Sequence, residues 1–412
     1  MDSHPISFHP DLRRAIHDLG FTKLTEIQRR TIPLIQQGKD VIGQAFTGSG
    51  KTLAFGVPGI ERILPGQGVQ MLVLVPTREL CNQVAKEMRK FAKYKPLKVV
   101  EVYGGVAIEP QMAQLKTADV VIATPGRMLD HLGRGTINLS KVMVLVLDEA
   151  DRMFDMGFVD DVKRIIGQTP KNRQTLLFSA TMSADVQNIG QFQMRDPVKV
   201  TVQTYVDKSM LTQVYYDLEQ RDKFSLLVHI LKHEHAGLVL IFCSTRIMVD
   251  ILQRNLERQG IKALGLHGGH AQEKRSKVMQ AFKNKELDVL IASDVAARGL
   301  DIQDIGSVIN YDLPKTSIEY VHRIGRTARA GAKGKVVSLL TSRDHDNFRR
   351  ILDDRSLDVK KAEKPHFARV PFSMGESYEK DRGGYGRRPM GHGRPMRSSE
   401  PQRYPRPRRP MR

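Results

Sequence analysis

Cysteine is almost absent from this sequence. Its 412 residues include only two, Cys81 and Cys243, which lie far apart and each beside an apolar segment. Neither a disulfide framework nor cysteine-based zinc spacing can be built from them, which indicates a reducing compartment. We therefore expect an intracellular, cytoplasmic protein.

Long apolar runs are also missing. The run Val142–Leu147 has six residues, far fewer than the roughly 18 that a membrane-spanning helix needs. The segment Met1–Pro10 lacks the apolar core of a signal peptide. These absences predict a soluble protein without a membrane partner.

Metal-ligand spacing is equally sparse. The pairs His233/His235 and His267/His270 are possible ligands by residue type. No further ligands stand at the set spacing that structural or catalytic metal sites show, so we expect these histidines to be solvated.

Positive charge is abundant. The chain carries 65 Lys and Arg against 45 Asp and Glu, a net charge of +20. This charge favours a polyanionic partner, with nucleic acid ahead of an acidic membrane.

The C-terminal residues 361–412 alone hold 14 basic and 5 acidic residues, with much Pro and Gly and few aliphatics. This composition predicts a disordered basic tail. Its segment Arg382–Arg388 interleaves arginine with Tyr385, which suits sequence-tolerant contact with single-stranded RNA, although a solubilising tail is the alternative.

Short apolar runs alternate with amphipathic stretches such as 79–94 and 246–259. This rhythm predicts two tandem α/β domains, each with a parallel sheet. We place the first domain at 1–205, a linker at 206–212 and the second domain at 213–360. The expected strands are 40–44, 71–75, 99–103, 120–123, 142–147 and 175–178, followed by 238–242, 263–266, 289–292, 308–311 and 336–340.

A small-residue loop follows the first strand. Its backbone N–H groups can cradle phosphates at the start of a helix. Lys51 would reach the β- and γ-phosphates, and the Thr52 hydroxyl would contact Mg²⁺. Ala45 stands where the strict P-loop pattern has glycine. The predicted phosphate-binding residues are Ala45, Phe46, Thr47, Gly48, Ser49, Gly50, Lys51 and Thr52.

Two acids, Asp148 and Glu149, end the run Val142–Leu147. Ligands bind at the carboxyl ends of strands in open parallel sheets, so this pair predicts the other wall of an Mg-NTP site. Ser179-Ala180-Thr181 ends another strand and could hydrogen-bond these acids. In the second half, the arginines of His322–Arg329 could stabilise charge on a transferring phosphoryl group.

These motifs, in this order over roughly residues 8–345, resemble the DEAD-box RNA helicases of superfamily two. The resemblance implies two RecA-like domains and an ATP-dependent enzyme that locally unwinds RNA. It assigns adenine recognition to Gln28 and Phe21, Mg²⁺ binding to Asp148, and water polarisation to Glu149. It further implies that Asp301 lies near the ribose and that Arg326 and Arg329 act as arginine fingers. The residues expected to couple ATP hydrolysis to RNA are Asp151, Ser179, Thr181, His322 and Arg323.

The same resemblance implies an RNA surface that reads phosphate and sugar rather than base sequence. The implied contacts are Pro76, Thr77, Arg78, Gly105, Thr124, Pro125, Gly126, Arg127, Gln272, Arg275 and Ser293. Two alternatives stay open: an ATP-gated RNA clamp or annealing chaperone with little unwinding, and a helicase that translocates on DNA. The segment around Gln28 and Ala150 in the acidic quartet argue against the second.

Overall fold

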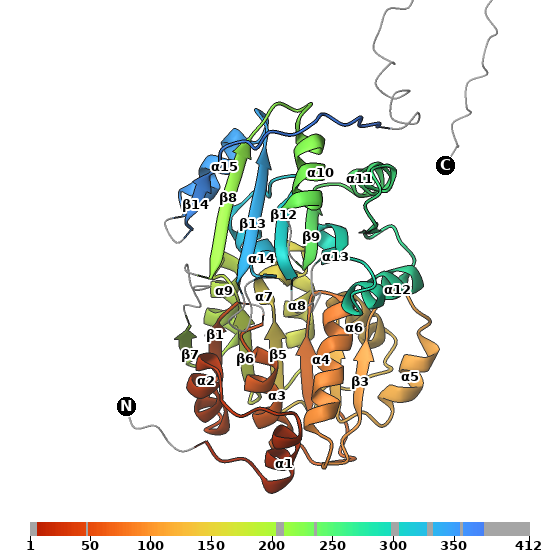
Figure 1. Ribbon diagram of the computed structural model, residues 1–412. Coiled ribbons are helices and arrows are strands. Elements are labelled where there is room, and N and C mark those ends of the chain that lie inside the picture. The colour runs from red at the N-terminus through yellow and green to blue at the C-terminus, as the bar shows by residue number, and fades with distance from the viewer. Residues whose placement is uncertain are drawn as a thin grey trace, which may run out of the picture. The chain divides into compact units, whose positions relative to one another are not determined.

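The computed structural model describes residues 6–46, 48–202, 210–234, 237–297, 305–327, 333–354 and 357–374. Within them the chain forms two sheets of seven strands, and all strand pairs are parallel (Figure 1). The expected pair of RecA-like α/β domains is confirmed. No helix in the described ranges has both the length and the apolar character that crossing a membrane requires.

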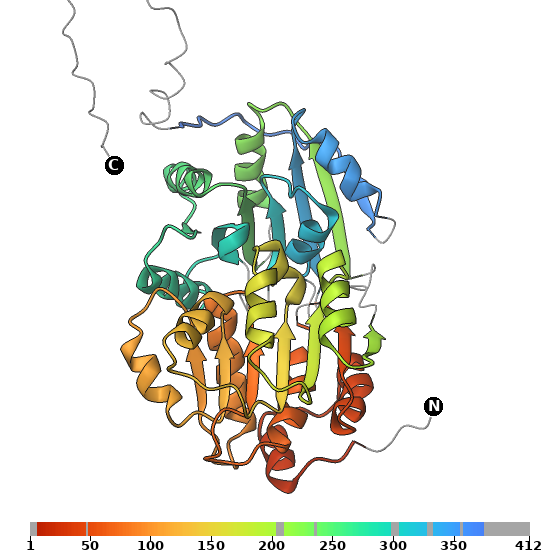
Figure 2. The same ribbon diagram turned by 180° about the vertical axis from the view of Figure 1, so that it is seen from behind.

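The first sheet has the strand order β3-β4-β2-β5-β6-β1-β7. Apolar side chains alternate between its faces. Val41 belongs to the apolar cluster that includes residues of α1 to α4, whereas Ile42 belongs to the cluster with residues of α6 to α9 on the opposite face. Figure 2 shows the molecule from behind, with this second layer of helices in front of the sheet. The strands are β1 (Val41–Gln44), β2 (Met71–Leu74), β3 (Val99–Val102), β4 (Val120–Ala123), β5 (Val144–Asp148), β6 (Gln174–Ser179) and β7 (Val198–Thr201). The helices are α1 (Pro10–Asp18), α2 (Glu26–Gln36), α3 (Lys51–Glu61), α4 (Arg78–Phe91), α5 (Glu109–Leu115), α6 (Pro125–Gly133), α7 (Ala150–Asp155), α8 (Val159–Ile166) and α9 (Ala184–Gln193).

The second sheet has the order β10-β11-β9-β12-β13-β8-β14. One face packs on α10 and α11, and the other on α12 to α15. The strands are β8 (Leu211–Asp217), β9 (Leu238–Cys243), β10 (Ala263–Leu266), β11 (Val289–Ser293), β12 (Ile305–Asn310), β13 (Gly334–Leu340) and β14 (Val359–Lys361). The helices are α10 (Lys223–His233), α11 (Arg246–Arg258), α12 (Gln272–Lys283), α13 (Asp294–Ala297), α14 (Ser317–Ile324) and α15 (His345–Leu352).

The expected boundaries need two corrections. Strand β8 begins at Leu211, so the end of the 206–212 linker belongs to the second sheet; residues 206–209 lie outside the described residues. The tail boundary at 360/361 is also wrong, because it falls inside β14, which pairs with β8. The compact unit that holds both sheets continues to Phe372.

Residues 362–372 form a strap over α10. Phe367 and Phe372 pack against the cluster that contains α10, and the rings of Phe372 and Phe224 are 4.9 Å apart. Arg369 Nε donates to Asp222 Oδ1 at 2.8 Å. Aromatic burial therefore fixes this segment despite the basic, proline-containing sequence around it. The rest of the expected tail, 375–412, lies outside the described residues.

Candidate nucleotide site and nucleic-acid cleft

The phosphate loop has the expected strand–loop–helix form. It leaves β1 at Gln44 and enters α3 at Lys51, with Gly50 in the left-handed region at φ 89°. The buried Lys51 Nζ donates to Ala45 O at 2.9 Å. A lysine buried with a carbonyl partner at the start of a helix is well placed to exchange that partner for an anionic phosphate. Thr47 lies outside the described residues.

Gln28 is engaged within the protein. Its Oε1 accepts from Thr25 N at 2.8 Å, as part of the capping box of α2, and its Nε2 donates to Gly50 O at 2.9 Å. A side chain at position 50 would collide with the Gln28 amide. The sequence did not reveal this direct link between the expected adenine reader and the phosphate loop. Phe21 is 44% exposed, so its ring face is accessible.

Asp148 and Glu149 are both buried at the end of β5. Burial raises the pKa of Asp148 to about 7, although nearby Lys51 lowers it. Burial also acts to raise the pKa of Glu149, but the positive charges of Arg152, Lys51 and Arg326 outweigh it and hold that pKa at about 2. Two adjacent carboxyl groups with opposite shifts are typical of sites in which each performs a different task.

A hydroxyl-bearing turn links the acids to the next strand, as expected. Asp151 Oδ2 accepts from Thr181 N at 2.8 Å and from Thr181 Oγ1 at 3.0 Å, while Asp151 N donates to Ser179 Oγ at 3.3 Å. His322 Nε2, on α14 of the second domain, lies 3.8 Å from the same Asp151 oxygen. Burial lowers the pKa of His322 to about 4, so at neutral pH this is a polar contact rather than an ion pair.

The arginines of the second domain divide into two groups. Arg323 is buried and makes bonds inside its own domain, to both oxygens of Asp294 at 2.6 and 2.7 Å and to Asn310 Oδ1 at 2.9 Å. This bidentate pair anchors α14. Arg326 is also buried, and its charge acts on Glu149. Arg329 and Asp301 lie outside the described residues.

A hollow of about 500 Å³ brings together most of the expected RNA contacts. Among the described residues, the buried atoms Arg78 Nε and Nη2, Arg127 Nη1 and Arg275 Nε have no hydrogen-bond partner. Arg275 Nη2 lies 2.8 Å from Glu79 Oε1, as an ion pair without hydrogen-bond alignment. The lining includes the expected Pro76, Thr77, Arg78, Thr124, Gly126, Arg127 and Arg275, together with Gly104, Gly268 and the acids Glu79 and Asp130.

The remaining expected RNA contacts lie on or directly beside the elements that line this hollow. Gly105 follows β3 with φ 77°, and a side chain there would meet the Arg78 guanidinium. Pro125 begins α6, Ser293 ends β11, and Gln272 is the first residue of α12. Buried guanidinium donors without partners are costly unless an anion satisfies them, so this cleft fits a phosphate-bearing ligand.

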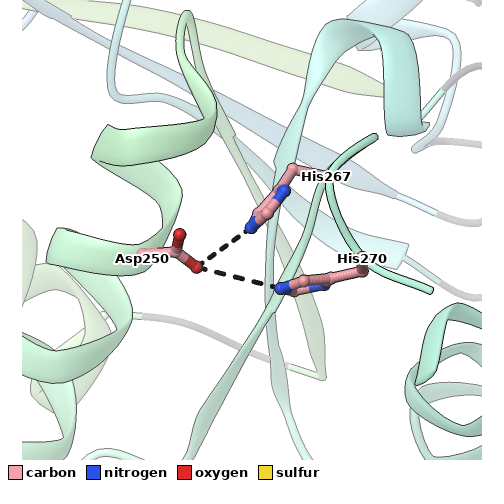
Figure 3. Close-up of side chains that lie close together, drawn as sticks. All are labelled: Asp250, His267 and His270. Atoms are coloured by element: carbon pink, nitrogen blue, oxygen red, sulfur yellow. Dashed lines mark hydrogen bonds and ion pairs between the residues drawn. The ribbon is translucent and has the colours of Figure 1, made fainter.

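The expectation that His267 and His270 are solvated is wrong. Figure 3 shows both rings facing Asp250, and His267 Nε2 lies 3.0 Å from Asp250 Oδ1. Among the described residues these three are the group that could hold a metal ion. However, His267 Nδ1 accepts from Gly269 N at 3.1 Å, and Lys274 Nζ lies 3.2 Å from His270 Nε2.

These contacts assign the cluster a structural role. A ring whose Nδ1 accepts a hydrogen bond carries its proton on Nε2, the atom that a metal would need. The cluster therefore fixes the turn that leads into α12. His233 ends α10, and His235 lies outside the described residues.

Sequence reasoning missed Arg152. Its Nη1 lies 2.6 Å from Glu149 Oε2, with both side chains buried. The signal was present, since a basic residue three positions after an acid at a helix start can reach back to it.

Comparison with known proteins places both domains. Residues 25–189 match the family model described as DEAD/DEAH box helicase, and 222–331 match that of the helicase conserved C-terminal domain. The chain is 44% identical over 344 residues to the DEAD-box ATP-dependent RNA helicase CshA of Bacillus subtilis, covering 83% of this chain and 70% of the relative. It is 43% identical over 343 residues to ATP-dependent RNA helicase CshA of Limosilactobacillus reuteri, covering 82% and 69%.

Solved structures of DEAD-box proteins are also similar to this chain. Dbp5 of S. cerevisiae bound to RNA and ADP BeF3 is 29% identical with a TM-score of 0.78, covering 86% of this chain and 94% of that one. A DEAD box protein from Methanococcus jannaschii is 40% identical with a TM-score of 0.54, covering 87% and 98%.

Proposed function

This chain belongs to the DEAD-box family of ATP-dependent RNA helicases, and we propose that the loop after β1 and the acids at the end of β5 hydrolyse ATP to drive local RNA unwinding and the remodelling of RNA–protein complexes. The observation that carries this proposal is the group of unpartnered buried guanidinium atoms on Arg78, Arg127 and Arg275. Phosphates of a single strand would satisfy them.

Hydrolysis needs a cation beside the phosphates. The Thr52 hydroxyl and the Asp148 carboxylate are hard oxygen donors that suit Mg²⁺. Asp148 is buried at the end of β5, and the charge of Lys51 at the start of α3 acts on it. When bound there, Mg²⁺ would offset negative charge on the phosphates. The residues present therefore fit this ion.

The protein's own groups perform the remaining steps. Lys51 would bind the β- and γ-phosphates, and Glu149 would orient a water and accept its proton. Arg326 and Arg329 would donate to the γ-phosphoryl oxygens, because planar guanidinium groups match phosphate geometry. Asp151, bound to Thr181 and near His322, would transmit the state of the site between the domains.

RNA stimulation of ATP hydrolysis tests the proposal. We expect single-stranded RNA to raise kcat at least tenfold, with DNA of the same sequence much less effective, and short RNA duplexes to separate when ATP is present. The double variant Arg78→Gln/Arg127→Gln should lose most of this stimulation but keep ATP binding. The exposed pair Lys39→Gln/Lys93→Gln serves as a control for lost charge.

Other outcomes would favour the alternatives. RNA-stimulated hydrolysis without displacement of any short duplex would identify an ATP-gated clamp or annealing chaperone. Equal stimulation by DNA and RNA would favour a DNA helicase.

Removal of residues 375–412 should weaken RNA binding several-fold and flatten its salt dependence, because fewer phosphates are neutralised. Titrations of labelled RNA between 50 and 300 mM salt would measure both effects. The truncation should keep the strap through Phe372, since a cut at 360 would also expose the α10 face. A same-length tail with its arginines replaced by serine separates charge from length. An unchanged salt slope would show that the tail only acts as a spacer.

A further inference from the structure

Glu149 has a direct partner that the mechanism above does not use. Arg152 Nη1 lies 2.6 Å from Glu149 Oε2, and each side chain is 5% exposed. The contact holds one of the two carboxylate oxygens. At this distance and burial the pair is far stronger than a surface ion pair, because water screens it little.

The backbone fixes both ends of this contact. Glu149 is the N-cap of α7 and has left-handed dihedrals, φ 52° and ψ 48°, a conformation that a residue with a side chain adopts rarely. Arg152 lies in the first turn of α7, and its own N–H donates to Asp151 Oδ1 at 3.0 Å. The turn of the helix therefore places the guanidinium over the Glu149 carboxylate while its backbone contacts the coupling aspartate.

The Arg152 side chain is almost completely buried. It lines a cavity of about 20 Å³ together with His322 and Arg326, which is room for about one water. The Glu149 carboxylate is thus buried beside a packed arginine, and the charge of Lys51 also acts on it. The residue that holds the Glu149 carboxylate, Arg152, therefore belongs to the same domain and to the helix that Glu149 caps.

We propose that Arg152 is a positioning residue for ATP hydrolysis: by holding Oε2 of Glu149, it fixes the direction in which the carboxylate presents its lone pairs to the attacking water. This inference rests on the proposed function, because it requires Glu149 to act on that water. Arg152 itself needs no contact with ATP.

Two consequences distinguish positioning from general structural support. Loss of Arg152 should lower kcat while the KM for ATP stays nearly constant, because the substrate does not contact it. This effect on kcat should also disappear when Glu149 can no longer accept a proton.

The test compares Arg152→Gln and Arg152→Lys with the parent protein, alone and combined with Glu149→Gln. We expect Arg152→Gln to lower RNA-stimulated kcat 10- to 50-fold, with KM for ATP and Kd for RNA within threefold. Arg152→Lys should recover part of the loss, because it keeps the charge but not the fork geometry. In the Glu149→Gln background, single-turnover rates should change less than twofold. Thermal melting and ADP binding verify that each variant is folded; if Arg152→Gln fails this check, Arg152→Lys carries the comparison.

Two results would overturn the inference. One is an Arg152→Gln variant whose kcat stays within twofold of the parent. The other is an equal fold-loss with and without Glu149, which would make Arg152 a structural residue. If Glu149→Gln itself turned over normally, the proposed role of Glu149 would fail instead, so the two failures are distinguishable.

Discussion

Glu149→Gln is expected to lower RNA-stimulated ATP turnover at least 100-fold, within the range attributed to a lost general base. The amide keeps the size of the side chain and can still accept a hydrogen bond from Arg152, so the fold should be retained. Binding of ATP and RNA should stay within threefold, because neither depends on proton acceptance. Steady-state phosphate release and a labelled-RNA titration measure the two quantities.

Glu109→Gln offers a matched control, since this glutamate begins α5 and is exposed. Its turnover should equal that of the parent. Turnover by Glu149→Gln within a few-fold of the parent would contradict the role of Glu149 and place the base elsewhere.

Lys51→Ala is expected to weaken ATP binding at least tenfold and to lower kcat by about 100-fold, because a buried cation that would contact phosphate is removed from a site that water screens little. The substitution has a second effect. Lys51 lowers the pKa of both Asp148 and Glu149, so its loss should raise both and make the residual activity fall at a higher pH as the solution is acidified.

Fluorescent ADP titration and a pH–rate profile between pH 5 and 9 measure these effects. Lys39→Ala is the control. This lysine is exposed and precedes β1, so its substitution removes the same charge outside the phosphate loop. Equal ATP affinity in Lys51→Ala and Lys39→Ala would show that the phosphate-loop assignment is wrong.

The inner strands could be predicted because burial on both faces demands continuous apolar residues. Val142–Leu147 shows this. Strand β5 ends with Asp148, at the carboxyl-end edge where open parallel sheets bind ligands. The strands that were missed lie at or near sheet edges. In β7 three of four residues are not fully buried, and β14 has one apolar residue in three. Their pairing comes from neighbouring strands rather than from a pattern of their own.

The strap at residues 362–372 is another element that its own sequence pattern did not predict. A composition rich in charge and proline predicted disorder from residue 361, yet Phe367 and Phe372, together with Ala362 and Val370, pack this segment against the cluster that contains α10. Composition averages over a segment, whereas packing depends on individual side chains that meet a complementary surface.

The sequence by itself determined the two parallel sheets, the phosphate loop and the acids at the end of β5, because each depends on local order along one strand or turn. Only the tertiary structure decided how the polar side chains are used. In the folded protein the Gln28 amide donates to Gly50 O, His267 is buried beside Asp250, and Arg323 bonds to Asp294 within its own domain. Arg152 also pairs with Glu149. Hydrogen-bond partners and local charge depend on the positions of atoms in space, and residue spacing along the chain does not determine them.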